Sequence, residues 1–378
     1  MRVEDFEQGC EREVVNDQEL HFVEVKRGGP LSVYGLPFWE QEEEFCRLPV
    51  GALPQQSKGV QGLAWHTSGV KVRFRSDTRA LAVRVKLRGH SYYPHMPMTT
   101  ISGFDLYMGQ GCAQQFVGVT RTPENTLAYT YPLFNWTTSE SQPCYPKWDP
   151  LDASGLRQFT MNFPLYNGVE KVEVGFMPGS RLEVPAPFTV PDPILFYGSS
   201  ITQGACASRP GNAYFQILGR RLDANVIGYG FAGNCRAEPV MLDVINSIPA
   251  PLAAFVFDYD HNAKNSEFLQ ETHQPFFRGF RQKHPDTPVI FMSKPDTDRA
   301  PEDTEKRRNI ILKTFLDARA EGDQNVYFVD GKLFMGTYDR DVSTMDGTHP
   351  TDIGFLHMAD AVEDTLRLAL ARKRVYHN

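Results

Sequence analysis

The hydrophobic pattern of this chain changes at a proline-rich stretch near its middle. Residues 184–193 read Val-Pro-Ala-Pro-Phe-Thr-Val-Pro-Asp-Pro, and four prolines favour an extended connector. Before this stretch apolar and polar residues alternate, whereas after it short apolar runs alternate with longer stretches of helical spacing. Because 378 residues also exceed the usual size of one domain, we predict two domains, residues 1–188 and 189–378.

The first half has the pattern of an antiparallel β-sandwich. Residues 70–75 alternate apolar and basic side chains, and residues 80–87 repeat the alternation after a short polar turn. Similar runs occur at 104–108 and 172–176, and no long amphipathic helix interrupts them. Period-two alternation with frequent turns is typical of strands that bury one face.

The second half has the pattern of a parallel sheet covered by helices. Its short apolar runs are typical of strands buried on both faces, and the stretches 213–222 and 305–320 have helical spacing. Alternating strands and helices predict a parallel sheet with helices on both faces, whose active site lies at the carboxyl ends of the strands. The predicted strands are 194–197, 225–229, 253–257, 288–292 and 326–329.

A serine follows the first of these predicted strands. The sequence Gly198-Ser199-Ser200 places a hydroxyl at a strand-to-helix corner, where helix N-terminal amides can stabilise negative charge. A serine hydroxyl is a poor nucleophile until a base removes its proton. The segment lacks the Gly-x-Ser-x-Gly pattern, and Ser199 is a rival to Ser200.

An acid and a base lie near the C-terminus. Asp346 and His349 are three residues apart in Asp-Gly-Thr-His-Pro, before the last predicted helix. This spacing allows both side chains to point to one side, so that Asp346 can orient His349 as the general base. The alternative is that Asp346 caps the helix and His349 packs locally.

Two further strand ends offer groups that can bind an oxyanion. Asn262 follows the third predicted strand, and Gly230 ends the second. The amide of Asn262 and the N–H groups of Gly230 and Ser200 would together form a three-donor oxyanion hole. Taken singly, both segments are ordinary turn compositions.

This set of residues resembles the SGNH (GDSL-type) hydrolase family. Ser200 resembles the family's nucleophile, Gly230 and Asn262 its oxyanion donors, and Asp346 with His349 its acid–base block. The resemblance covers roughly 190–375 and implies a flavodoxin-like, three-layer α/β/α sheet. It also implies a Ser-His-Asp triad that cleaves small acyl esters through an acyl-enzyme, without metal or cofactor.

The chain departs from the family pattern at three positions. Ser199, Gly228 and Asp260 stand where aspartate, asparagine and glycine are usual. A further segment, 162–168, resembles a jelly-roll-like β-sandwich domain that precedes the catalytic domain in one branch of the family. The departures put the preferred substrate in question more than the serine itself.

Two other features have a functional and a plainer interpretation. His261 can line the pocket or compete as a base, although a loop histidine with local hydrogen bonds is the plainer account. The aromatic, proline-rich segment 90–97 can wall an acyl pocket or bury its rings at the domain interface.

Composition excludes several classes of partner. A formal charge of −7 and a pI near 5.8 argue against nucleic acid, and no run approaches the roughly 18 apolar residues of a membrane span. The acidic N-terminus lacks the apolar core of a signal peptide, so we expect a cytoplasmic protein. The six cysteines are scattered without a Cys-x-x-Cys pair, which predicts free thiols and no metal site.

The sequence therefore predicts a serine esterase that acts on a small-molecule or carbohydrate ester. Acetyl esters of sugars are one such class of substrate. One alternative is an acyltransferase that uses the same residues with an alcohol acceptor. Another is a catalytically inactive carbohydrate-binding protein, against which the intact set of Ser200, Asn262, Asp346 and His349 argues.

Overall fold

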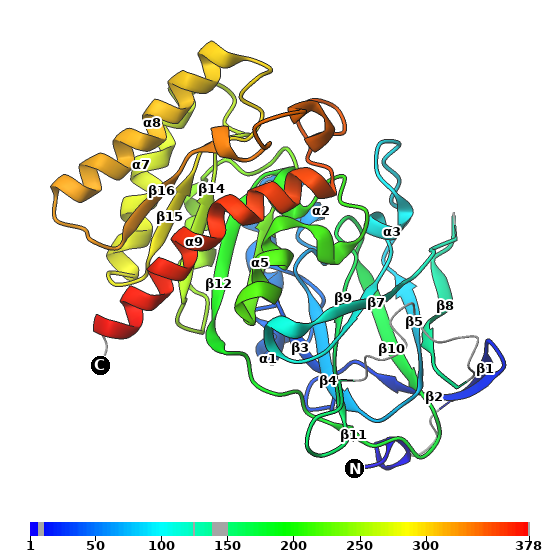
Figure 1. The fold of residues 1–378 in the computed structure, drawn as a ribbon. Coiled ribbons are helices and arrows are strands. Elements are labelled where there is room, and N and C mark those ends of the chain that lie inside the picture. The colour runs from blue at the N-terminus through cyan, green and yellow to red at the C-terminus, as the bar shows by residue number, and fades with distance from the viewer. Residues whose placement is uncertain (7–10, 124, 138–149, 377–378) are drawn as a thin grey trace.

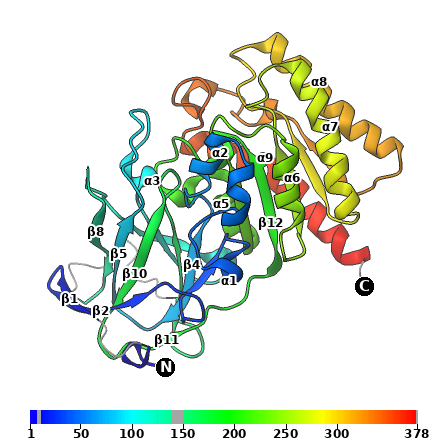
Figure 2. The same cartoon turned by 180° about the vertical axis from the view of Figure 1, so that it is seen from behind.

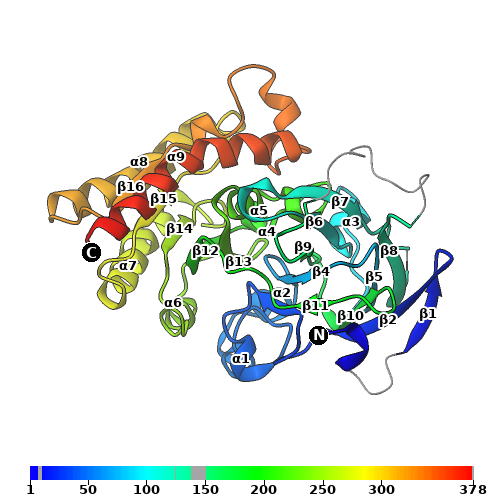
Figure 3. The same ribbon diagram turned by 60° about the horizontal axis from the view of Figure 1, so that its bottom comes forward.

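Two antiparallel sheets and one parallel sheet form the framework of the molecule (Figure 1). The computed structural model describes residues 1–6, 11–123, 125–137 and 150–376. Figure 3 shows the antiparallel sheets and the parallel sheet side by side, with the proline-rich connector running between them. The mixed fold predicted from the sequence, a β-rich first half and an α/β second half, is confirmed.

The antiparallel sheets enclose a core of apolar side chains. Val72 and Phe74 from one sheet pack with Leu81 and Val83 from the other, as period-two alternation requires. One sheet has the order β1 (Arg12–Val15), β2 (Gln18–Glu24), β10 (Val169–Phe176), β5 (Ala80–Leu87) and β8 (Ala128–Asn135). The other has the order β11 (Leu182–Glu183), β4 (Lys71–Ser76), β9 (Arg157–Asn162), β6 (Asp105–Met108) and β7 (Gln115–Val119), and β3 (Ser32–Tyr34) pairs with β4.

Helices in the first half are short, as the sequence predicts. Within the described residues they are η1 (Val3–Asp5), α1 (Trp39–Glu42), η2 (Val50–Gln55), α2 (Lys58–Leu63), α3 (Met98–Ile101) and η3 (Gly111–Ala113). The segment around α1 and α2 contributes Leu48, Val60 and Ala64 to the core beneath the parallel sheet. Figure 2 shows α2 on this side of the parallel sheet. The division of the chain into two domains at residue 188 stays a prediction.

The parallel sheet contains the five strands predicted from the sequence. Their order is β13 (Ala224–Gly230), β12 (Val190–Gly198), β14 (Ala254–Asp258), β15 (Val289–Met292) and β16 (Val326–Val329), the order of a flavodoxin-like sheet. Ile194 and Phe196 face one core, while Leu195 and Tyr197 face the other. Burial on both faces explains why these strands are continuously apolar.

Helices cover both faces of the parallel sheet. On one face lie α5 (Tyr214–Leu222) and α9 (Asp352–Tyr376), and on the other lie α6 (Pro239–Asn246), α7 (Ser266–Lys283) and α8 (Pro301–Ala320). The predicted helix 305–320 begins earlier, because Pro301 suits the first turn of a helix. Within the described residues, no helix is both long enough and apolar enough to span a membrane. The short helices are α4 (Ser200–Gln203), η5 (Pro210–Asn212), η6 (Gly331–Leu333) and η7 (Arg340–Ser343).

A buried arginine joins the two halves beside the edge strand β13. Arg47 Nη1 donates to the carbonyl oxygens of Gly228 and Gly230, each at 2.7 Å, and Nη2 donates to Leu63 O at 2.6 Å. A Cβ on Gly228 would lie 3.0 Å from the carbonyl oxygen of Ser68. This close approach of the first half leaves little room for a side chain at position 228.

Candidate active site

The turn after β12 gives its two serines different partners. Ser199 is the N-cap of α4, and its hydroxyl accepts a hydrogen bond from the N–H of Ile201 at 3.2 Å. Ser200 is the first residue of α4, and its own N–H has no hydrogen bond within the described residues. A Cβ on Gly198 would lie 2.8 Å from the carbonyl oxygen of Asp258, so the strand must end in glycine. Ser199 is thus used as a cap, which leaves Ser200 available for chemistry.

The structure brings Ser200 together with the acid and the base from the far end of the chain. Ser200 Oγ lies 2.9 Å from Nε2 of His349, and Nδ1 of His349 lies 2.8 Å from Oδ2 of Asp346. The other oxygen of Asp346 accepts the N–H groups of Thr348 at 3.0 Å and His349 at 2.8 Å. Partial burial opposes ionisation of Asp346, but these hydrogen bonds and the charge of His349 lower its pKa to about 2. An ionised Asp346 accepts the proton on Nδ1 and leaves Nε2 to accept one from Ser200.

The loop after β14 orients the amide of Asn262. Its Oδ1 accepts a hydrogen bond from the N–H of Cys235 at 3.2 Å, while its Nδ2 has no partner within the described part of the chain. This bond joins Asn262 to residues 231–235, the loop after β13. The carbonyl end of the amide is thereby fixed and its two N–H donors remain available.

Two glycines near the end of β13 have contrasting environments. Gly230 is buried within the strand, and a Cβ there would lie 2.1 Å from the backbone nitrogen of Gln203 in α4. Gly233 is exposed at φ +69°, a Cβ there would meet nothing within 4 Å, and its N–H has no hydrogen bond among the described residues. An oxyanion donor must face the pocket, so the geometry favours Gly233 over the predicted Gly230. The sequence held both glycines, but it could not show which one lies beyond the strand end.

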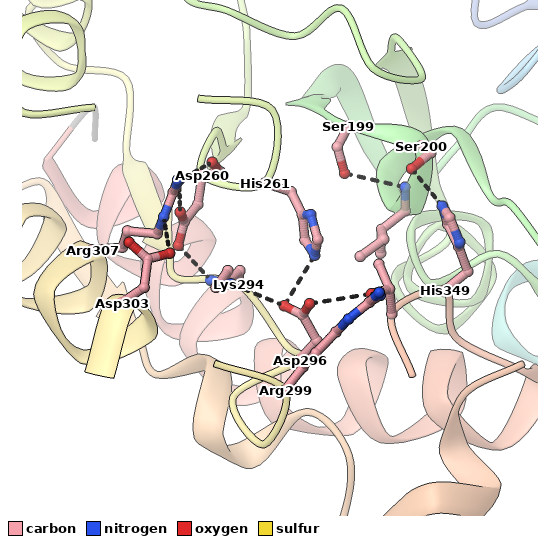
Figure 4. A network of polar contacts seen from close by, with 12 residues as sticks. Ser199, Ser200, Asp260, His261, Lys294, Asp296, Arg299, Asp303, Arg307 and His349 are labelled. Carbon is pink, nitrogen blue, oxygen red and sulfur yellow. Dashed lines mark hydrogen bonds and ion pairs between the residues drawn. The ribbon is translucent and has the colours of Figure 1, made fainter. Parts of the chain in front are cut away.

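A buried carboxylate connects the loops that carry Asn262 and the triad (Figure 4). Asp296 Oδ1 lies 3.0 Å from Nε2 of His261, and its Oδ2 accepts from Thr348 Oγ1 at 3.3 Å. Arg299 Nη1 donates to the same hydroxyl at 2.7 Å. Burial raises the pKa of Asp296, but His261 and Lys294 outweigh burial and lower it overall. Sequence reasoning missed Asp296 and Arg299, since neither belongs to a recognised motif.

The aspartate at position 260, where glycine is usual, points away from the triad. Its Oδ2 accepts from the backbone N–H of Lys294 at 2.8 Å, and its Oδ1 lies 3.4 Å from Nη1 of Arg307 (Figure 4). Burial raises the pKa of Asp260, and these partners oppose that shift. Asp260 therefore links the loop after β14 to the segment that follows β15 and to α8.

The β-sandwich half supplies side chains beside the triad. The hydroxyl of Tyr166 donates to the carbonyl oxygen of Ser200 at 3.0 Å, and the ring of Tyr93 meets that of Tyr166 edge to face. The ring of His95 lies 5.7 Å from the ring of His349. The segment 90–97 therefore contacts the residues around Ser200 and His349, and does more than bury its rings between the two halves.

The chain matches two family models in sequence. Residues 191–367 match the GDSL-like lipase/acylhydrolase family, and residues 21–182 match the N-terminus of SGNH-hydrolase-type esterases. A search of curated proteins finds no match to the chain.

Solved structures share the fold at low sequence identity. A GDSL-like lipase from Bacteroides ovatus is 24% identical with a TM-score of 0.79, and the alignment covers 93% of this chain and 98% of that one. The salicylyl-acyltransferase SsfX3 from a tetracycline biosynthetic pathway is 19% identical with a TM-score of 0.70, over 92% and 97% of the two chains. A family two carbohydrate esterase from Clostridium thermocellum is 14% identical with a TM-score of 0.58, over 80% and 93%.

Proposed function

Because the chain belongs to the SGNH (GDSL-type) hydrolase family, an acylhydrolase family, we propose that it is a serine esterase that cleaves small acyl esters with Ser200 as its nucleophile. The observation that carries this proposal is the unbroken chain of contacts from Ser200 through His349 to Asp346. A nucleophile, a base and a group that orients the base are the requirements for activating a serine hydroxyl.

The proposed reaction has two acyl-transfer steps. His349 Nε2 takes the proton of Ser200 as Oγ attacks the ester carbonyl, and the ionised Asp346 stabilises the imidazolium that forms. His349 then donates this proton to the leaving alcohol, which leaves an acyl-enzyme. Water repeats the sequence, and its attack releases the acid and free Ser200.

Three N–H groups are proposed to bind the oxyanion. They are the backbone N–H of Ser200, the side-chain amide of Asn262 and the backbone N–H of Gly233, which takes the place of the predicted Gly230. The support is that each of the three lacks a partner among the described residues, whereas Gly230 is packed against α4. Loss of one such donor typically costs about 10²–10³ in rate.

We propose an acetyl or similarly small acyl group as the substrate, carried by a carbohydrate or another alcohol. The support is the shared fold with carbohydrate esterases from Clostridium thermocellum and Cellvibrio japonicus. Exposed tyrosine and histidine side chains in the segment 90–97, such as Tyr92, offer faces and polar groups for a sugar ring.

Hydrolysis of p-nitrophenyl acetate and butyrate by matched serine variants tests the proposal. Ser200→Ala should lower kcat by about 10⁴-fold or more, because it removes the nucleophile. Ser199→Ala is the control, since it removes only the cap of α4 and should retain activity at a stability cost of about 1 kcal/mol. The proposal fails if Ser200→Ala stays active, and Ser199 then becomes the candidate nucleophile.

An acyltransferase is the second candidate function, supported by the shared fold with SsfX3. The same residues would form the acyl-enzyme, and an alcohol would replace water in the second step. Product analysis with and without a sugar or other alcohol acceptor separates the two functions. Glycan binding without turnover of any ester would instead support an inactive carbohydrate-binding protein.

A further inference from the structure

Three side chains that commonly bind transition metals converge beside the triad. One ligand atom each from His95, Cys206 and His349 lies within 4.8 Å of the other two. His95 comes from the sandwich half, Cys206 from the loop after α4, and His349 from the triad loop. These three residues lie far apart in the sequence, which explains why the spacing of the cysteines alone predicted no metal site.

Packing brings the first two segments of this cluster together. Cys206 Sγ lies 3.6 Å from the carbonyl oxygen of His95, and Thr100 Oγ1 donates to the carbonyl oxygen of Ala207. Cys206 is buried, whereas His95 is exposed. The cluster therefore combines a buried thiol with an exposed imidazole.

The ligand types suit a borderline-soft divalent cation. Zn²⁺ binds imidazole nitrogen and thiolate sulfur in tetrahedral sites, with bonds of about 2.0–2.1 and 2.3 Å. These lengths require ligand atoms about 3.4–3.6 Å apart. Rotation of His95 toward Cys206 and a small shift of His349 would close the cluster to that size.

We propose that His95, Cys206 and His349 form a site for Zn²⁺ or a similar cation, and that occupation of this site switches the enzyme off. Nδ1 of His349 donates its proton to Asp346, so the lone pair open to a metal is that of Nε2. That lone pair is the one that receives the Ser200 proton, and a bound cation removes the base. The inhibition rests on the proposed function, whereas the metal site itself does not.

Metal binding also releases a proton from the thiol. Zn²⁺ displaces the Cys206 proton to form a zinc–thiolate bond, and no electrons are transferred. The proton passes to the solvent, so the step balances in atoms and in charge.

Titration with Co²⁺ tests the site without reference to activity. Wild type should develop a thiolate-to-cobalt charge-transfer band in the near ultraviolet, which Cys206→Ser abolishes and His95→Ala weakens. Cys112→Ser is the matched control, because Cys112 is an exposed free thiol that contacts the carbonyl oxygen of Arg221 instead. A band that survives in Cys206→Ser, or no band in wild type, would overturn the proposed site.

Ester hydrolysis in the presence of Zn²⁺ tests the switch. Wild type should lose activity and regain it with a chelator. Cys206→Ser should keep its metal-free activity and require at least about tenfold more Zn²⁺ for half-inhibition, the lower end of the cost of weakening a metal site. Equal sensitivity of both proteins would refute the switch. If wild type hydrolyses no ester, the proposed function fails, and the Co²⁺ titration still decides the metal site.

Discussion

The hydrogen bonds of Asp346 make its asparagine variant a sharp test of the triad. Oδ1 is held by the N–H groups of Thr348 and His349, so an asparagine must keep its own oxygen there to avoid losing both bonds. Its NH₂ group then faces Nδ1 of His349, across the 2.8 Å now spanned by Oδ2. Because Nδ1 must then accept a hydrogen bond, the ring proton of His349 moves to Nε2. His349 therefore presents a proton to Ser200 and can no longer accept one from it.

The expected cost follows from this change of tautomer. Two of the three hydrogen bonds of Asp346 persist, so the loop should stay folded and KM should change little. The base is lost, however, and the corresponding change in a serine-protease triad lowers kcat by about 10⁴, or about 5.4 kcal/mol of barrier. Steady-state hydrolysis of p-nitrophenyl acetate by wild type and Asp346→Asn gives kcat and KM separately.

A neighbouring carboxylate provides the control for charge alone. Asp341→Asn removes one negative charge from exposed η7, upstream on the same loop, and should leave kcat within a few-fold of wild type. If Asp346→Asn keeps kcat within tenfold, or changes only KM, Asp346 does not set the tautomer of His349. The triad mechanism as written here would then be wrong.

Four further variants probe the site and the contact between the halves. Gly230→Ala should destabilise the protein by about 1–3 kcal/mol or more in urea unfolding, because its Cβ meets the backbone of α4. Gly233→Ala meets no neighbouring atom and should cost only the strain of a positive φ, about 1–2 kcal/mol. Asp296→Asn should lower kcat/KM about 10-fold to 100-fold, because it weakens the contacts that join the loop of His261 to the loop of Thr348. Burial lowers the pKa of Lys71 from 10.5 to about 7, so the unfolded state binds more protons above pH 7 and stability should rise by about 2 kcal/mol from pH 7 to 9. In Lys71→Met this rise in stability should be absent when urea unfolding is measured at both pH values. If the pH dependence of stability is the same as in wild type, the lowered pKa of Lys71 is contradicted.

Local periodicity was enough to predict the elements of the fold. Each strand of the parallel sheet is a short apolar run, because Ile194 and Leu195 face different cores and both must be apolar. Alternation in β4 reflects one apolar face, with Val72 and Phe74 in the sandwich core, whereas Lys71 on the other face is buried against the second half of the chain. These patterns are set by neighbours within a few residues, so the sequence alone reveals them.

The contact of Ser200 with His349 and of His349 with Asp346 was also predictable, because each of the segments involved is short in sequence. Asp346 and His349 are close enough for one loop to set their geometry, and Ser200 follows the first strand of the sheet. Parallel strands bring their carboxyl ends to one edge, which is why residues 146 positions apart (346 − 200) were expected to meet.

Tertiary packing decided what lies around that triad. The sequence alone determined a sandwich, a parallel sheet and the residues able to activate Ser200. Only the structure distinguished buried Gly230 from exposed Gly233, and only it placed Asp296 between two loops and Cys206 beside His95. Such contacts join segments far apart in the chain, so they leave no periodicity or spacing in the sequence. They depend on how whole elements pack, and packing is a property of the folded chain.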